Sequence, residues 1–178
     1  MPKVPDPSGQ PPGDDLLKIL TDKSRTRIQN EGEEKIFNRW LDSVTSDGPD
    51  IWETTPGEYP SKTRKDDYAI VFKELALQTQ KRVDSVVRWP RDSARWPERD
   101  IHCYELIEVK DTDGEVPEEV IGELLMESET FKSEFSLNDW EIEITILLND
   151  VDWESKQEFQ KMCDAQDIEI SLEVAPSD

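Results

Sequence analysis

The repeat period of the apolar residues changes near residue 101, and this change constrains the fold more than any other feature of the chain. Before it, apolar residues recur every three to four positions, as on one face of an amphipathic helix. After it, strand-like segments at 101–109, 140–148 and 168–174 are separated by two helical segments. The second half of the chain is therefore predicted to have a β-α-β-α-β order.

These elements predict an α+β fold with a small sheet. The last two strands carry glutamates on one side, so we expect helices to cover only the other side. One domain is expected over residues 14–178, because a chain of this length usually builds a single core. It comprises a helical half (14–88), a connector (88–100) and a sheet half (101–175), preceded by a disordered proline-rich tail (1–13).

The helical half is predicted to contain two helical regions. In the first, apolar spacing continues from Asp14 to Val44, and either one long helix runs through Gly32 or two helices meet there. The second is predicted over 66–88, where apolar residues fall on one helical face and Pro90 prevents continuation. Those apolar residues are Tyr68, Phe72, Leu75, Val83 and Val86.

Charge is distributed unevenly along the chain. The net charge is −21, to which residues 1–60 contribute −5, residues 61–99 contribute +4 and residues 100–178 contribute −20. An acidic half of this size repels nucleic acid and anionic membranes, and it attracts cationic partners. We therefore expect a basic protein as the partner, and neither a membrane nor direct nucleic-acid binding.

The chain offers few residues for zinc or nucleophilic chemistry. His102 is the only histidine, Cys103 and Cys163 form no CxxC pair, and the common nucleotide, hydrolase and metalloprotease motifs are absent. The chain contains no run of about 18 apolar residues, so no membrane span is predicted. We expect a cytoplasmic protein with two buried, reduced thiols and no cofactor.

An acidic strand face is the first candidate binding surface. Alternation puts four glutamates on the same side of the last two strands: Glu141, Glu143, Glu169 and Glu173. Like charges on neighbouring strands destabilise a sheet, so their presence is consistent with a basic partner or with mimicry of nucleic-acid phosphates. The alternative is a solvated face that prevents edge aggregation.

A repeated Arg-Trp-Pro sequence in the connector is the second candidate surface. It supplies residue types that are common at interface hot spots: Arg88, Trp89, Arg91, Arg95 and Trp96. The alternative is that the tryptophans cover the end of the core while the arginines pair with nearby acidic residues.

A third candidate site lies on the strand at 101–109 and just beyond it. Asp100 precedes this strand, and Glu108-Val109-Lys110 ends it. The sequence resembles the PD-(D/E)xK nucleases, in which acidic residues hold Mg²⁺ and the lysine helps to position the attacking water. In that family the first Asp usually lies on the other strand of a hairpin, and too few residues separate Asp100 from Glu108 for a turn.

The leading functional hypothesis is a non-enzymatic acidic protein that binds a basic protein, as inhibitors, immunity proteins, antitoxins and viral antagonists do. The first alternative is a Mg²⁺-dependent nuclease of the PD-(D/E)xK type, with Asp100, Glu108 and Lys110 as its catalytic residues. The second alternative is a structural subunit of a larger assembly.

Overall fold

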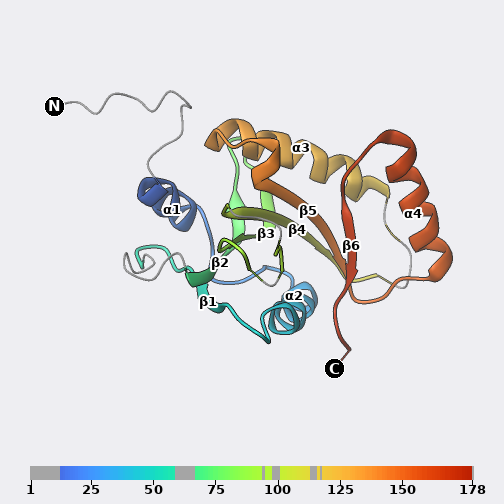
Figure 1. Cartoon of the computed structure of the whole chain (residues 1–178), viewed down its shortest axis with the longest axis horizontal. Coiled ribbons are helices and arrows are strands. Elements are labelled where there is room, and N and C mark those ends of the chain that lie inside the picture. The colour runs from blue at the N-terminus through green and yellow to red at the C-terminus, as the bar shows by residue number, and fades with distance from the viewer. Residues whose placement is uncertain are drawn as a thin grey trace.

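The computed structural model describes residues 13–58, 67–93, 95–97, 101–112, 116 and 118–177. Within these residues, a six-stranded mixed sheet has helices on both faces (Figure 1). Its strands are β1 (Asp50–Glu53), β2 (Tyr68–Ala76), β3 (Arg82–Trp89), β4 (Cys103–Lys110), β5 (Ile142–Leu148) and β6 (Ser171–Val174). The helices are α1 (Gly13–Asp22), α2 (Glu31–Val44), α3 (Glu118–Phe135) and α4 (Trp153–Gln166), with a 3-10 turn η2 (Asp139–Glu141). The proline-rich tail predicted over 1–13 lies almost wholly outside the described residues.

The strands are ordered in the sheet as they are in the chain. β1 is parallel to β2, whereas β3 is antiparallel to both of its neighbours, β2 and β4. β4, β5 and β6 are mutually parallel, because α3 and α4 serve as the crossover connections between them. The predicted α+β class and the alternation of strands and helices in the second half are confirmed.

The helix predicted over 66–88 is wrong, because this segment is the hairpin of β2 and β3. The hairpin turns at Leu77, whose N–H donates to the carbonyl of Lys81 at 2.9 Å. Every residue from Ala69 to Leu75 is buried, so β2 lacks the apolar–polar alternation that identifies a strand with one exposed face. The helical half is therefore helical only in its first part.

The first helical region consists of two helices, and the break between them is not at Gly32. The chain leaves helical geometry after Asp22 and begins α2 at Glu31, where the Asn30 side chain accepts a hydrogen bond from Glu33 N–H. Gly32 lies in the first turn of α2, and a Cβ there would be 3.0 Å from Asp111 Oδ2. The first turn of α2 therefore lies close to Asp111, which follows the end of β4.

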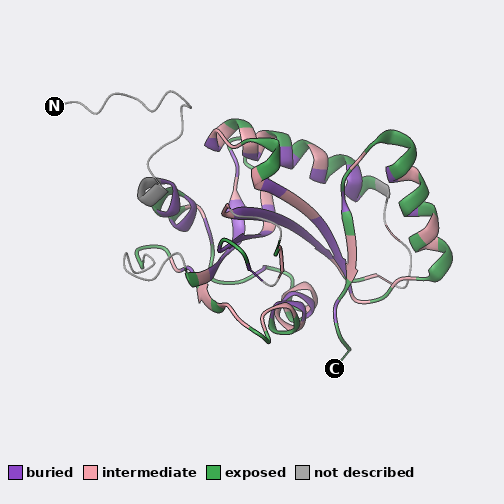
Figure 2. Cartoon of the chain, in the orientation of Figure 1, coloured by how far each residue is buried: buried purple, intermediate pink, exposed green. Residues whose placement is uncertain are grey.

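Both faces of the sheet are covered, in contrast to the single covered face that we expected. α1, α3 and α4 pack on one face, and α2 packs on the other through Phe37 and Trp40, which are fully buried. Figure 2 shows the buried central strands between these layers and the exposed outer side of α4. α2 can cover the face that carries glutamates because some of those glutamates are paired, as described below.

Cys103 and Cys163 pack in the cores on opposite faces of the sheet, and both are buried without forming a disulfide. Their prediction as buried thiols is confirmed. Among the helices that the structure describes, none combines the length and the apolar composition needed to cross a bilayer.

Candidate active site

Two acidic residues stand at the point where β3 and β4 stop pairing. The last registered pair of these strands is Ser85–Ile107, and one step further the antiparallel register puts Asp84 opposite Glu108. Asp84 Oδ2 accepts a hydrogen bond of 2.8 Å from the backbone N–H of Val109. The antiparallel strands β3 and β4 therefore each carry one of these two carboxyl groups.

Lys110 follows Glu108 on the same strand, two residues further on. Its Nζ lies 3.4 Å from Glu108 Oε1. The other oxygen, Glu108 Oε2, is buried without a hydrogen-bond partner, and so is Oε2 of Glu127 on α3. Buried acceptors without a donor destabilise a fold, and a water molecule or an ion is one means by which such an oxygen is satisfied.

Helices from both faces of the sheet bring further carboxyl groups to Asp84. Glu33 comes from the first turn of α2, and Glu127 comes from α3. The negative charge of Asp84 raises the pKa of Glu33, Glu108 and Glu127 alike. Asp84 is therefore the shared neighbour of these side chains. We call Glu33, Asp84, Glu108, Lys110 and Glu127 the Asp84 cluster.

Burial is the largest cause of the raised pKa values in the Asp84 cluster. It raises the pKa of Glu108 to about 9, of Glu33 and Glu127 to about 7, and of Asp84 to about 6. Burial alone would lower the pKa of Lys110, but the carboxylates around it raise that pKa. The positive charge of Lys110 lowers the pKa of each carboxyl group without cancelling the effect of burial. Perturbed groups of this kind are typical of functional sites.

The sequence pattern identifies two members of this cluster and misses the residue at its centre. Glu108 and Lys110 are named by it, whereas Asp100, their predicted partner, lies outside the described residues. Asp84 is missed because a helix over 66–88 places it far from the strand that ends in Lys110. The signal that favours a strand there is the run of β-branched residues around Asp84, which are Val83, Val86 and Val87.

A second group of buried charges lies over the middle of the sheet, around Glu105. Glu105 is fully buried, and Arg95 Nη2 lies 2.7 Å from its Oε2. Trp89 Nε1 donates to Glu105 Oε1 at 2.9 Å, and the Thr145 hydroxyl donates to Oε2 at 2.6 Å. Both oxygens of this buried carboxylate are therefore satisfied.

The same arginine also binds Glu173 on β6. Arg95 Nη1 donates to Glu173 Oε1 at 2.9 Å, and Trp40 Nε1 donates to the same oxygen at 3.0 Å. The guanidinium also lies over two indole rings, 5.2 Å from that of Trp40 and 5.0 Å from that of Trp96. We call this group the Arg95 clamp, comprising Trp40, Trp89, Arg95, Trp96, Glu105, Thr145 and Glu173.

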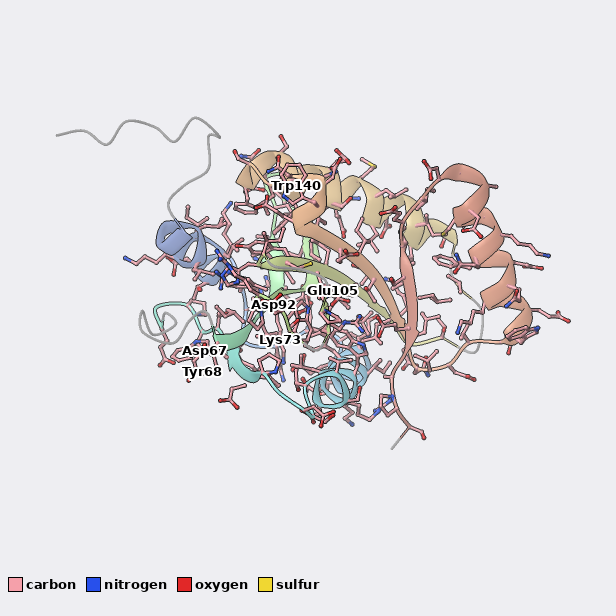
Figure 3. All side chains as sticks on the ribbon, viewed as in Figure 1. Asp67, Tyr68, Lys73, Asp92, Glu105 and Trp140 are labelled. Carbon is pink, nitrogen blue, oxygen red and sulfur yellow. The ribbon has the colours of Figure 1, made fainter. Side chains whose placement is uncertain are left out.

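The remaining glutamates of the predicted acidic face have different surroundings. Glu169 is exposed and precedes β6, whereas Glu141 in η2 and Glu143 in β5 are half-buried. Trp140, the neighbour of Glu141, is 60% exposed and lies beside α3, well away from Glu105 (Figure 3). Of the four predicted glutamates, Glu173 is the one that belongs to the Arg95 clamp.

The Arg-Trp-Pro repeat folds back onto the molecule. Trp89 is fully buried, Trp96 is half-buried, and Arg88 is buried beside Tyr104. Arg91 is exposed. For Trp89 and Arg95, the contacts match the alternative in which the tryptophan covers the core and the arginine pairs with local acidic residues.

The Asp84 cluster and the Arg95 clamp are thus two buried charged groups, one at the end of the sheet and the other over its middle. Comparison with protein-family models, curated proteins and solved structures gives no match. The function is therefore argued from the geometry of these groups.

Proposed function

We propose that this chain is a metal-dependent phosphodiesterase that cleaves nucleic acid, of the PD-(D/E)xK type. The observation that carries the proposal is the position of Asp84, opposite Glu108 on the neighbouring strand of a hairpin and hydrogen-bonded to the residue between Glu108 and Lys110. This arrangement matches the pattern in which the first Asp and the ExK tripeptide lie on separate strands. Asp84 takes the role that the sequence pattern assigns to Asp100.

The donor atoms of the Asp84 cluster fit a hard divalent cation. Asp84 and Glu108 would hold Mg²⁺ through carboxylate oxygens, the ligands that this ion prefers, and Glu108 Oε2 is buried without a partner. Among the described residues, no three acidic, His or Cys side chains already surround one point as metal ligands do. The raised pKa of Glu108 keeps that group protonated beside Asp84 at neutral pH, so a divalent cation would have to displace this proton to bind both groups as carboxylates.

The chemistry assigned to each residue follows from its charge and its pKa. Mg²⁺, when bound, would polarise the scissile phosphate and lower the pKa of a coordinated water. Lys110 remains protonated at neutral pH and can donate to a phosphate oxygen or orient the attacking water. Glu33, with a pKa of about 7, suits the acceptance of a proton from that water near neutral pH.

The test is hydrolysis of labelled single-stranded and double-stranded DNA and RNA in Mg²⁺ or Mn²⁺. We expect Asp84→Asn, Glu108→Gln and Lys110→Ala each to lower the cleavage rate by at least about 100-fold. Glu154→Gln, which removes an exposed carboxylate from α4, is the matched control and should cleave at the wild-type rate. A folded wild-type protein that cleaves none of these substrates, or an Asp84→Asn variant with full activity, would contradict the proposal.

A second candidate function is the acidic protein that binds a basic protein partner. It is favoured by the net charge of −21 and by exposed acidic residues on and around α4: Asp152, Glu154, Glu158, Asp164, Asp167 and Glu169. Pull-down at low and high salt tests it, since a basic partner should be lost as the salt concentration rises. Retention of no basic protein at low salt would remove this candidate.

The structural-subunit hypothesis is favoured by large apolar side chains on the surface. Met126, Trp140 and Trp153 are 70%, 60% and 73% exposed. Sedimentation of the purified chain tests self-assembly directly, and a monomer at high concentration would rule it out.

A further inference from the structure

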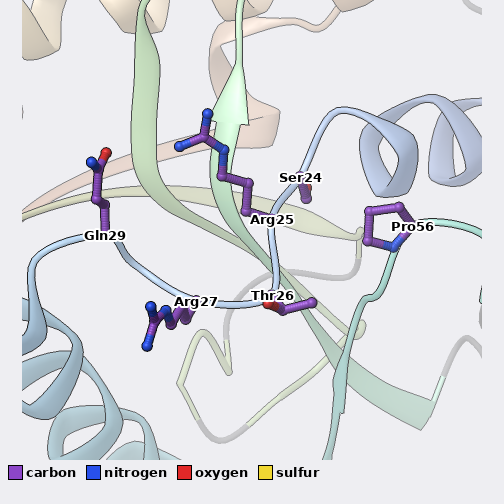
Figure 4. A pocket seen from close by; sticks show the side chains of 6 residues that line it. All are labelled: Ser24, Arg25, Thr26, Arg27, Gln29 and Pro56. Atoms are coloured by element: carbon purple, nitrogen blue, oxygen red, sulfur yellow. The ribbon is translucent and has the colours of Figure 1, made fainter.

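A pocket of about 440 Å³ lies beside the connection between α1 and α2, close to the β1–β2 loop (Figure 4). It is lined by Ser24, Arg25, Thr26, Arg27, Gln29 and Pro56. Its volume is within the range of sites for small ligands and polymer subunits. We propose that Arg25 and Arg27 in this pocket bind backbone phosphates of a nucleic-acid strand, and that another phosphodiester of the same strand reaches the Asp84 cluster.

The pocket wall is held in place by hydrogen bonds to β2. Arg25 N–H donates to the carbonyl of Lys73 at 2.8 Å, and Ala76 N–H donates to the carbonyl of Lys23 at 3.0 Å. Residues 23–25 therefore lie along β2 as an additional short edge, with Arg25 and Lys73 in an antiparallel bridge. These bonds fix the backbone at Arg25, from which one of the two arginine side chains extends, and so lower the backbone entropy lost on binding.

Arg25 and Arg27 differ from Arg95 in their surroundings, because Arg95 is paired with acidic side chains and, among the described residues, they are not. Both are exposed, and within the described part of the chain neither forms an ion pair. Arg95, by contrast, binds two glutamates. In a chain with a net charge of −21, two unpaired guanidinium groups beside one pocket form a local site for an anion.

Glu74 connects this pocket to the Asp84 cluster. Gln29, which lines the pocket, donates its backbone N–H to Glu74 Oε1 at 2.9 Å. In the pairing of β2 with β3, Lys73 lies opposite Ser85 and Leu75 lies opposite Val83, so Glu74 lies beside Asp84. The pocket and the cluster are therefore neighbouring sites, with Glu74 between them.

The ligand that suits both sites together is a polymer of phosphodiesters. A strand can place one phosphate at the carboxylates with a divalent cation and another phosphate at the arginines, which need no metal ion. The acidic half of the chain is expected to repel nucleic acid. The two arginines of the pocket offset this repulsion locally, because they attract the phosphates of the strand. This inference rests on the proposed nuclease function for the identity of the ligand.

The test measures binding and cleavage separately. Binding is followed by fluorescence anisotropy of a labelled single-stranded DNA, its duplex and the corresponding RNA, in an Asp84→Asn background that keeps the probe intact. The pocket variant is Arg25→Glu/Arg27→Glu. The matched control is Lys156→Glu/Lys161→Glu, which makes the same change in net charge at exposed positions of α4, distant from the pocket (Figure 1).

We expect the pocket variant to raise Kd by at least about 10-fold, and the control variant by less than about threefold, at the same salt concentration. The slope of log Kd against log salt should fall by about 1.4–1.8, since each lost phosphate contact contributes about 0.7–0.9. Arg25→Lys/Arg27→Lys, which keeps both charges, should restore most of the binding. Equal weakening by the pocket and control variants would overturn the inference.

Cleavage in the otherwise wild-type chain separates this inference from the proposed function. If both hold, the pocket variant raises KM while kcat at saturation changes by less than about threefold. Cleavage with an unchanged KM overturns the pocket and supports the nuclease. Binding that depends on the arginines, without any cleavage by the wild type, supports the phosphate pocket and overturns the nuclease.

Discussion

The Arg95 clamp and the Asp84 cluster lie in the same sheet, and both bury acidic side chains. They differ in how far those side chains are paired and hydrogen-bonded. In the clamp, the buried carboxylate of Glu105 receives hydrogen bonds from three side chains. In the cluster, four carboxyl groups share Lys110, and two carboxylate oxygens have no hydrogen-bond partner. Burial and repulsion from nearby carboxylates raise the pKa values of all four carboxyl groups in the cluster.

This difference is the reason why we assign a structural role to the clamp and propose a functional one for the cluster. A buried carboxylate with complete hydrogen bonding, such as that of Glu105, is compatible with a stable core, although its ion pair contributes little beyond an apolar pair of the same volume. The polar atom of the clamp that lacks a partner is Trp96 Nε1, which carries no charge. A buried group of partly compensated carboxyl groups lowers stability, and such groups concentrate at sites that bind cations or transfer protons. The clamp allows α2 to pack on the sheet, whereas the cluster is the site that we propose to bind a cation.

The largest expected effect is loss of the arginine of the clamp. Arg95→Met leaves Glu105 and Glu173 without their cation, and we expect the free energy of unfolding to fall by about 3–5 kcal/mol. Urea denaturation measures this value. Arg91→Met, at an exposed position in the same connector, is the control and should change stability by less than about 0.5 kcal/mol. A loss below about 1 kcal/mol for Arg95→Met would show that the clamp does not hold the two glutamates.

The Asp84 cluster predicts that stability falls as the pH rises from about 5 to about 8. Its acidic groups have a higher pKa in the folded chain than in the unfolded chain, so the folded state binds more protons in this range. Each buried group contributes up to about 1.4 kcal/mol per pH unit, and we expect a total fall of about 2–3 kcal/mol after allowance for solvent screening.

Denaturation at a series of pH values measures this fall. Asp84→Asn/Glu108→Gln should flatten the dependence, whereas Glu154→Gln/Glu158→Gln, which removes two exposed charges from α4, should leave it nearly unchanged. If this cluster variant showed the same pH dependence as the wild type, the raised pKa values of the cluster would not be the cause of that dependence.

Binding of a divalent cation should stabilise the folded chain through the same carboxylates. At ten times its Kd, Mg²⁺ or Mn²⁺ should add about 1.4 kcal/mol, which corresponds to a rise in Tm of about 3–5 °C. The Asp84→Asn/Glu108→Gln variant should show no such rise in a thermal melt. An equal rise in both proteins would locate the ion elsewhere.

The smallest effect concerns a single hydrogen bond of the clamp. Thr145→Val keeps the shape of the side chain but removes the hydroxyl that donates to Glu105 Oε2 at 2.6 Å. We expect a loss of about 1 kcal/mol, because Arg95 still binds that oxygen. Thr79→Val in the exposed β2–β3 turn is the control for the substitution itself, and urea denaturation compares the two. A Thr145→Val variant as stable as the control would mean that this hydroxyl contributes nothing to holding Glu105.

The sequence identified the parts of the fold whose patterns are local. β5 alternates apolar and polar residues, α4 begins after a capping segment, and both were placed correctly. Glu108 and Lys110 were also recognised as a candidate catalytic pair on a strand, because the tripeptide lies within one element. These features depend on residues that are near one another in the chain.

The hairpin of β2 and β3 was not predictable in the same way. β2 is buried along both faces, and even its polar residues are covered: Lys73 is 4% exposed and forms an ion pair with Glu34 at 2.7 Å. A strand buried on both faces has no alternation, so its period resembles that of a buried helix. Because Asp84 lies on β3 of this hairpin, the predicted helix also hides its position beside Glu108.

The sequence by itself therefore determined the α+β class, the alternating second half and the Glu108–Lys110 pair. The tertiary structure alone decided which charges are paired and which are not. Arg95 and Glu173 are 78 residues apart in the chain, and α2 and α3 bring Glu33 and Glu127 to Asp84 from opposite faces of the sheet. Burial and charge pairing depend on such distant contacts, and they separate the glutamates that hold the fold together from those proposed to do chemistry.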